Sequence, residues 1–189
     1  MAKFSSSNDR GFSLAEVVVA IGITTSALLA LAQLFAMAIS ANTAAKNTTF
    51  ATVLAEQKLE QLRALAWGFD PLGLPLTDTT TNTAVDPEAP VGGTGLTPSP
   101  GTALQQNTPG WVDYIDRNGR IVGSDAIPPA SALYFRRWSV EPLPTNPNNT
   151  IIIQVLVGPI RDRGAADEGR VGRLGQEARV ATVKTRKSQ

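Results

Sequence analysis

Residues 12–39 read FSLAEVVVAIGITTSALLALAQLFAMAI, an apolar run with no proline and a single charge, Glu16. These 28 residues would form a helix of about 42 Å, which exceeds the roughly 30 Å hydrocarbon layer of a membrane. Lys3 and Arg10 precede the run, and basic residues favour the cytoplasmic side. The pattern predicts one membrane-spanning helix, residues 12–40, with its N-terminus in the cytoplasm and the remainder of the chain on the other side.

A secretory signal peptide also begins with basic residues and an apolar stretch. The run is longer than the usual apolar core of about 7–15 residues, and it continues without glycine or proline into residues 41–67. There, small and apolar residues recur at helical spacing, with charged residues on another face. The apolar stripe is Ala51, Ala55, Leu59, Leu62 and Ala66, and the charged face is Glu56, Glu60 and Arg63. We therefore expect one helix whose second half, 41–67, is amphipathic and packs on a folded body.

The 189-residue chain contains no histidine and no cysteine, and its 17 basic residues nearly balance its 16 acidic ones. It therefore has no imidazole base, no thiolate nucleophile, no Ser-His-Asp triad and no Cys/His zinc site. A net charge of +1 gives no overall attraction for a polyanion, so nucleic acid is not an expected partner. Basic residues outnumber acidic ones after residue 160, so binding of nucleic acid there is not excluded. We expect a protein that is not an enzyme and needs no cofactor, metal or small-molecule substrate.

Glu16 lies four residues inside the apolar run. An ionised carboxylate in a membrane costs several kcal/mol unless it has a partner, so acids in spanning helices are candidate functional residues. The competing interpretation is that Glu16 reaches the lipid headgroups near the end of the helix and has no function. The residues by themselves leave both interpretations open.

The residues around this acid, Arg10-Gly11-Phe12-Ser13-Leu14-Ala15-Glu16, closely resemble the class III signal of type IV pilins and of type II secretion pseudopilins. In that family a prepilin peptidase cuts a short basic leader after the glycine, and the new N-terminal phenylalanine is methylated. The resemblance implies a leader of residues 1–11, cleavage between Gly11 and Phe12, N-methylation of Phe12, and an assembly role for Glu16.

This motif has a chemical rationale in an assembled filament. The α-amine of Phe12 stays positively charged near neutral pH and can meet Glu16 of an adjacent subunit in a water-poor core. An unpaired ion there would be heavily penalised, so the pairing would select the register of the subunits. Major subunits of the family often carry a helix-breaking proline in this helix, and this sequence has none there, which leaves partial melting on assembly open.

The composition changes abruptly after the helix. Residues 68–110 are rich in proline, glycine and threonine and are expected to form a long loop. Further on, apolar runs predict strands, and Asn118-Gly119 favours a hairpin turn over a calcium loop formed with Asp113 and Asp116. The predicted strands are 111–115, 120–122, 133–140, 150–157 and 179–186, the last two joined by a solvated loop at 161–177. The fold class is therefore α+β and pilin-like, a long N-terminal helix packed on a small antiparallel sheet, residues 111–189.

By this resemblance we expect a minor pilin of a type IV pilus or related filament, a structural subunit assembled through packing of its N-terminal helix. The expected partners are the prepilin peptidase, other pilins or pseudopilins, an inner-membrane assembly platform with its ATPase, and membrane lipid. The subunit would first span the inner membrane once, with its head in the periplasm. It would then join a cell-surface pilus that serves adhesion or motility, or a periplasmic pseudopilus that serves protein secretion.

Two alternatives remain open. The chain could be a minor pseudopilin of a type II secretion system, since the motif is shared by both kinds of filament. From a different class, it could be a single-span, membrane-anchored periplasmic binding protein or enzyme in which Glu16 is incidental. Such an anchor would have no need of Gly11-Phe12 or of an acid inside its span.

We expect co-expression with a prepilin peptidase to leave 178 of the 189 residues, beginning at Phe12, because the leader ends at Gly11. Mass spectrometry of the purified protein measures the new N-terminus. Gly11→Val should block the cut and leave membrane insertion intact. An intact Met1 start, or a cut near Ala41 as in a secretory signal, would contradict the prediction.

Overall fold

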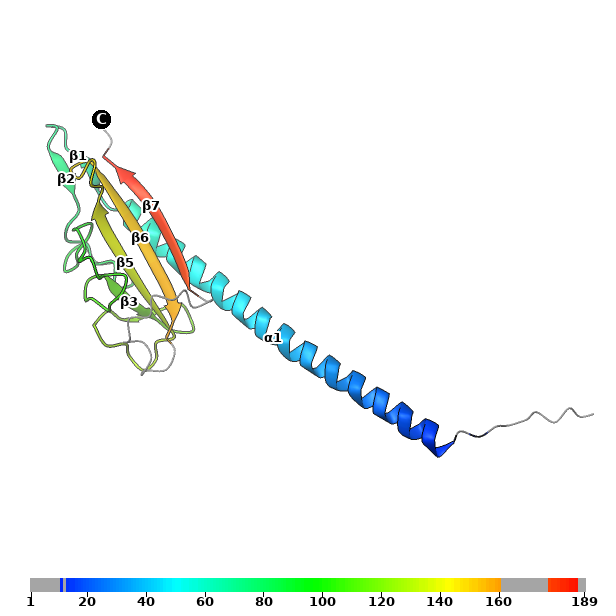
Figure 1. Ribbon diagram of the computed structural model, residues 1–189. Coiled ribbons are helices and arrows are strands. Elements are labelled where there is room, and N and C mark those ends of the chain that lie inside the picture. The colour runs from blue at the N-terminus through cyan, green and yellow to red at the C-terminus, as the bar shows by residue number, and fades with distance from the viewer. Residues whose placement is uncertain (1–10, 12, 161–176, 187–189) are drawn as a thin grey trace, which may run out of the picture. The chain divides into compact units, whose positions relative to one another are not determined.

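The computed structural model describes residues 11, 13–160 and 177–186 (Figure 1). The chain divides into two compact units, Met1–Thr43 and Ala44–Gln189, and we call the second unit the head. Helix α1, Leu14–Ala64, runs through both units. All of the described strands belong to the head.

Helix α1 is continuous over 51 residues and ends earlier than the sequence predicts. It ends at Ala64 rather than Trp67, because Trp67 already belongs to a strand. Lys184 Nζ donates a hydrogen bond to the carbonyl oxygen of Arg63 at 2.6 Å and another to that of Leu65. The lysine thereby satisfies carbonyl groups that the end of a helix leaves open, and its charge complements the helix dipole.

The main sheet has five strands in the order β4-β3-β5-β6-β7, all antiparallel to their neighbours. They are β3 (Val112–Ile115), β4 (Ile121–Gly123), β5 (Tyr134–Pro142), β6 (Thr150–Pro159) and β7 (Ala178–Thr185). Strand β5 is paired with β6 along its whole length, from Tyr134 opposite Pro159 to Pro142 opposite Ile151. The predicted α+β, pilin-like fold is confirmed. The loop predicted at 161–177 lies outside the described residues except for Glu177.

The turn between β3 and β4 forms at the predicted Asn118-Gly119. Gly119 has a φ of 81°, a left-handed conformation that glycine adopts without strain. The Asp116 carboxylate accepts hydrogen bonds from the backbone N–H groups of Asn118 at 2.8 Å and Arg120 at 3.0 Å, which is typical of an Asp at a turn. Asp113 pairs with cations elsewhere, so the two acids do not form a common cation site.

The segment 68–110 is mostly irregular and contains one regular element that its composition does not indicate. Strands β1 (Trp67–Phe69) and β2 (Pro75–Thr77) form a short antiparallel hairpin. The rest of the segment packs on the head: Leu96 is 1% exposed, and its N–H donates to the carbonyl oxygen of Asp78 at 2.7 Å. The segment is therefore part of the folded structure rather than a tether.

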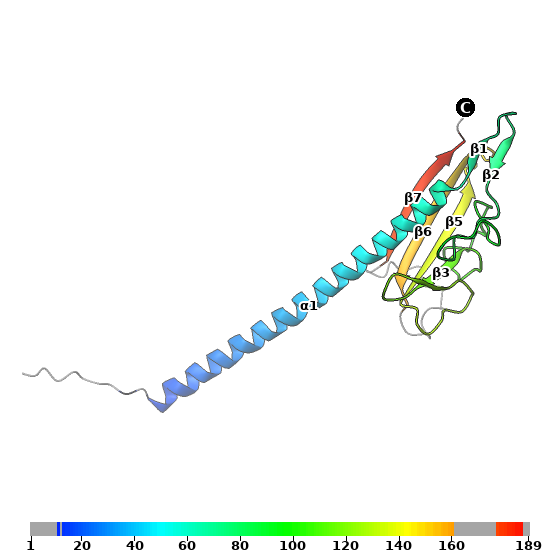
Figure 2. The ribbon, with the colours of Figure 1, turned by 180° about the vertical axis from the view of Figure 1, so that it is seen from behind.

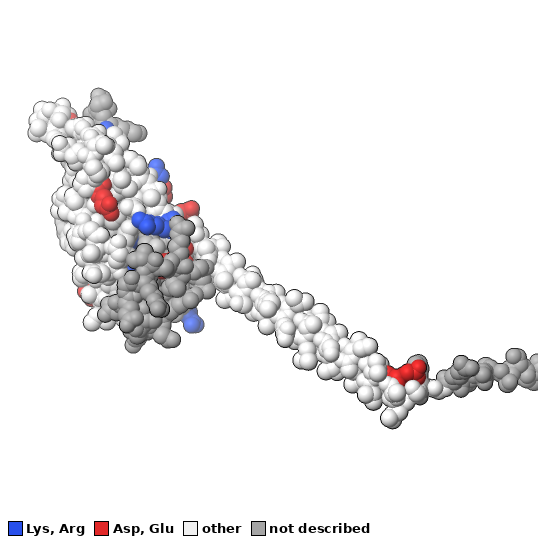
Figure 3. Space-filling model, viewed as in Figure 1, with Lys and Arg blue, Asp and Glu red and all other residues white. Residues whose placement is uncertain are grey.

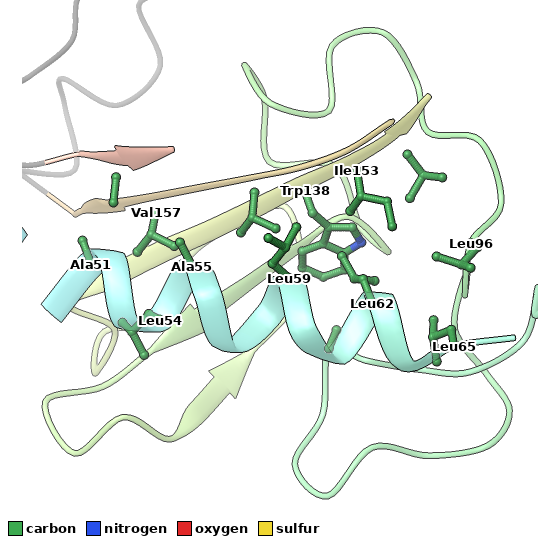
Figure 4. Close-up of a cluster of buried hydrophobic side chains, with 14 of the residues drawn as sticks. Ala51, Leu54, Ala55, Leu59, Leu62, Leu65, Leu96, Trp138, Ile153 and Val157 are labelled. Carbon is green, nitrogen blue, oxygen red and sulfur yellow. The ribbon is translucent and has the colours of Figure 1, made fainter. Parts of the chain in front are cut away.

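The main core lies between the second half of α1 and one face of the sheet (Figure 4). Its helical side chains are Ala51, Leu54, Ala55, Leu59 and Leu62, and the facing strands supply Trp138, Val140, Ile153, Val155 and Val157. Each large apolar side chain buried in this way contributes about 1.5–3 kcal/mol. Four of the five residues in the predicted stripe are therefore buried as expected. The fifth, Ala66, lies past the end of the helix and is exposed.

Three charged side chains are buried together where α1 meets the sheet. Asp113 on β3 accepts hydrogen bonds from Arg136 Nε at 2.9 Å and Nη2 at 2.8 Å, and its Oδ2 lies 2.9 Å from Lys58 Nζ. Lys58 and Asp113 are fully buried, and Arg136 is 3% exposed. Arg136 also donates to the carbonyl oxygen of Leu54 at 3.2 Å, and Lys58 donates to that of Thr83. The cluster therefore joins helix, sheet and the 68–110 segment through one carboxylate.

The cluster holds two cations and one anion. This excess of positive charge and the burial of the cluster change the pKa of Lys58. Burial lowers the pKa of Lys58 to about 8, the attraction of Asp113 opposes this shift, and repulsion from Arg136 adds to it. The ammonium group also lies 4.1 Å from the centre of the Trp138 ring, a favourable cation–π contact. Lys58 is thus charged at neutral pH, but its charge is costly to keep in the core.

We expect Asp113→Asn to lower the free energy of unfolding by about 3–5 kcal/mol, because Lys58 and Arg136 would then be buried together without an anion. Lys58→Met should cost less, about 1–2 kcal/mol, because Arg136 still pairs with Asp113 and the main loss is the donor to Thr83. Urea unfolding of a chain truncated to begin at Ala41, which lacks the apolar run, measures both values. Equal losses for the two variants would show that the carboxylate does not hold the cluster together.

The same cluster should make the head more stable as the pH rises from about 8 towards about 10.5. Because the folded chain releases the Lys58 proton at a lower pH, the unfolded chain binds more protons in this window, and the free energy of unfolding increases. Below about pH 8 both states keep the proton and the gain is absent.

The measurement compares urea unfolding of the truncated chain and of its Lys58→Met variant near pH 7.5 and near pH 9.5, where the expected gain is on the order of 2 kcal/mol. The part of the gain that comes from Lys58 should be missing in the variant, which keeps only the response of Lys184, whose pKa burial also lowers. An equal increase in the free energy of unfolding of both proteins would show that groups other than Lys58 cause it. Tyr114 cannot supply a gain, because burial raises its pKa to about 12 and a raised tyrosine pKa lowers stability at high pH.

Candidate functional site

The residues predicted to act in processing and assembly lie at the start of α1. Gly11 is described and exposed, and Phe12 lies outside the described residues. Glu16 is in the first turn of the helix and is also exposed. The structure therefore describes the acid of the predicted site and its surroundings, while the cleavage and methylation of Phe12 stay predictions.

Glu16 forms a capping box with Ser13. The Glu16 Oε2 atom accepts hydrogen bonds from the Ser13 backbone N–H at 2.8 Å and from the Ser13 hydroxyl at 2.9 Å. In return, the Glu16 N–H donates to Ser13 Oγ at 3.3 Å. This reciprocal arrangement satisfies donors that a helix start leaves open, and a carboxylate there is favoured by the helix dipole.

The sequence carries this signal in Ser13-Leu14-Ala15-Glu16, the S-x-x-E pattern before an apolar run. Glu16 stands out in the sequence for its charge, and Ser13 was missed as its partner. Both bonds to the carboxylate end on Oε2, and no hydrogen bond to Oε1 is found among the described residues. The cap therefore holds the side chain in place and leaves one oxygen open to another donor.

Beyond Glu16, the first part of α1 is apolar on every side and exposed. Large apolar side chains from Val17 to Ile39 are between about half and two-thirds exposed. The space-filling view shows this stretch without charge apart from an acidic spot at its start (Figure 3). The helix has the length and composition needed to cross a membrane.

The hydroxyl groups in this stretch are satisfied within the helix itself. Thr24 Oγ1 donates to the carbonyl oxygen of Ala20, and Thr25 Oγ1 to that of Ile21, each at 2.8 Å. Ser26 makes the same contact with Gly22 at 2.9 Å. Because these donors need no water, they do not oppose transfer of the helix into an apolar environment.

Gln33 is the exception among the polar side chains of this stretch. Its amide makes no hydrogen bond to any described residue, and it is exposed in the middle of the apolar surface. In lipid or in a bundle of helices, such a group is satisfied by a polar partner on a neighbouring helix. The stretch is therefore suited to a membrane and to helix packing at the same time.

Nothing in the described part of the chain gathers three or more Asp and Glu side chains at a distance that could hold a metal ion. Three buried ions of the head, Lys58, Asp113 and Arg136, are committed to one another. A fourth, Arg137, donates hydrogen bonds to the Asn107 side chain and to the carbonyl oxygens of Leu104 and Gln105. The described residues that stand out chemically are those of the capping box.

Comparison of the chain with models of protein families, with curated proteins and with solved structures finds no match. The class of the protein therefore follows from its own architecture. It is an α+β protein of pilin-like fold, with a long apolar N-terminal helix and an antiparallel sheet packed on the second half of that helix.

Proposed function

We propose that this protein is a structural subunit, a minor pilin of a type IV pilus or a related filament. The observation that carries the proposal is a capped acid, Glu16, at the start of the exposed apolar stretch of α1 and five residues after Gly11. An ordinary membrane anchor needs neither the leader glycine nor an acid inside its span. A minor pseudopilin of a type II secretion system is supported by the same residues.

The proposed mechanism uses the apolar part of α1 in two environments. Before assembly, lipid covers this surface and the subunit is stored in the inner membrane. After the prepilin peptidase removes residues 1–11, an assembly platform and its ATPase supply the work of extraction. Neighbouring helices then replace lipid around the same apolar side chains. Because both environments are apolar, these side chains stay shielded from water during the exchange.

Glu16 supplies the specificity that apolar contacts lack. The new α-amine at Phe12 of one subunit is charged near neutral pH and can bind the carboxylate of a neighbour in the filament core. The capping box leaves Oε1 open for this contact. A subunit in the wrong register would leave the carboxylate unpaired in an apolar core, which is strongly unfavourable.

We expect Glu16→Gln and Ser13→Ala to separate the charge of the acid from its capping role. Glutamine keeps the capping-box geometry and removes the charge, whereas Ser13→Ala removes the cap and keeps the carboxylate. If the charge selects the register, Glu16→Gln should be cleaved and inserted normally but be depleted from sheared filaments by about tenfold or more. Ser13→Ala should be incorporated close to the wild-type level.

The measurement is quantitative immunoblotting of sheared filaments against the membrane fraction, with the mass of the processed chain checked first. Glu16→Leu serves as a second variant, because it also removes the charge and is well tolerated in a membrane. Incorporation of both Glu16 variants at the wild-type level would show that the acid has no role in assembly. Depletion of Ser13→Ala alone would show that Glu16 acts only by capping the helix.

A further inference from the structure

The β1–β2 hairpin of the head carries an apolar tip that nothing in the described chain covers. Residues 71–76 read Pro-Leu-Gly-Leu-Pro-Leu, and all six are exposed and uncharged. Leu72 is 84% exposed, Leu74 59% and Leu76 49%. Single exposed leucines are ordinary on protein surfaces, but an unbroken exposed run of this kind marks an interaction site.

The tip has a defined conformation. The Asp70 carboxylate accepts hydrogen bonds from the backbone N–H groups of Leu72 at 2.9 Å and Leu74 at 2.8 Å. The Asp70 N–H donates to the carbonyl oxygen of Leu74, and the N–H of Gly73 donates to that of Asp70, both at 2.9 Å. Gly73 has a φ of 79°, which a glycine adopts without strain. The leucines therefore project from a turn that needs no further ordering before it binds.

The base of the hairpin is fixed to the end of the sheet where β7 ends (Figures 1 and 2). Arg186 Nη1 donates to the carbonyl oxygens of Gly68 at 2.7 Å and Leu76 at 2.6 Å. Its guanidinium carbon lies 3.7 Å from the centre of the Trp67 ring. A rigid base and an ordered turn lower the entropic cost of binding.

We propose that the hairpin tip docks into an apolar cleft on the head of a neighbouring subunit in the filament. The proposal rests on the function proposed above and names a second contact for it, separate from the packing of the apolar helices. The tip supplies three leucines and no charge, so the cleft that receives it is lined by apolar side chains. Asp70 at the edge of the turn favours a basic residue at the rim of that cleft.

The protein's own membrane is a poor alternative for the tip. The helix of the head, from Ala44 to Ala64, covers about 30 Å. The apolar run precedes its first residue in the chain, and the hairpin follows its last. The tip and the membrane-compatible segment are thus connected to opposite ends of this helix. Arg186, the cation of the hairpin base, is occupied by backbone carbonyls, while Asp70 would be repelled by anionic lipid.

The size of the tip argues against an independent soluble partner. Its three leucines expose on the order of 350 Å² of apolar surface, whereas a stable interface buries about 800 Å² on each side. The tip by itself is too small to hold a free protein. It is sufficient for a neighbour that other contacts already hold in place, which is the situation of a subunit packed through its N-terminal helix.

The test places the photo-crosslinker p-benzoylphenylalanine at Leu72 in the full chain, in cells that assemble the filament, with Ile127 as the matched control position. Ile127 is 81% exposed and lies in the loop between β4 and β5. We expect an adduct from position 72 with a second protein, identified by mass spectrometry, whose encoded precursor has a leader glycine followed directly by Phe and, four residues later, by Glu. We expect no such adduct from position 127. A phospholipid adduct, an adduct with a protein lacking that N-terminus, or no adduct would overturn the proposal.

A second measurement uses side-chain substitutions. The double variant Leu72→Ser, Leu74→Ser should be processed normally and be reduced at least about fivefold in sheared filaments, whereas Ile127→Ser should stay within about twofold of wild type. Wild-type incorporation of the double variant would overturn the docking role alone and leave the filament function in place. A chain that is never cut after Gly11 would overturn both proposals.

Discussion

The carboxylate of Asp113 is the contact on which the head depends. It lies on β3 and binds one cation from the helix, Lys58, and one from the neighbouring strand β5, Arg136. Three charges that are removed from water are favourable only when all are in place and well oriented, because each one alone would be strongly penalised. The apolar stripe of α1 would tolerate sliding along the sheet, but a small shift of the helix would separate Lys58 from its anion. The ionic cluster therefore fixes where the helix lies along the sheet, whereas hydrophobic packing holds the helix and the sheet together.

Helix α1 meets two different requirements along one continuous element. In the head it buries one stripe and keeps Glu56 and Glu60 in water, as a helix on the surface of a soluble domain does. In the first unit it has no such polarity, and its hydroxyl groups bond to carbonyl oxygens of the preceding turn. No single hydrophobic stripe describes the whole helix. Its two parts are suited to different surroundings, which fits the proposed function of a subunit that moves from lipid into a helical assembly.

Much of the fold could be predicted because it depends on periodicity. The helical stripe, the five strands and the turn at Gly119 follow from patterns of a few residues. The ionic cluster depends on residues 23 to 78 positions apart, but one signal was present: Lys58 stands four residues from both Leu54 and Leu62, inside the buried stripe. The β1–β2 hairpin was missed because its strands have three residues each and contain glycine or proline. At the start of the helix, Glu16 was recognised for its charge, and the capping box that it forms with Ser13 was missed.

The contact of Lys184 with the end of α1 links two positions far apart in the chain, since the lysine follows Arg63 by 121 residues. Contacts between positions so distant form late, because closing a long loop costs entropy. During synthesis the helix leaves the ribosome well before Lys184 is translated, so its last carbonyl groups must wait for that side chain. A polypeptide released before Lys184 would keep its apolar segment but would have a frayed helix end and a hairpin without its clamp. Such a chain would be open to proteases where α1 ends and the hairpin begins.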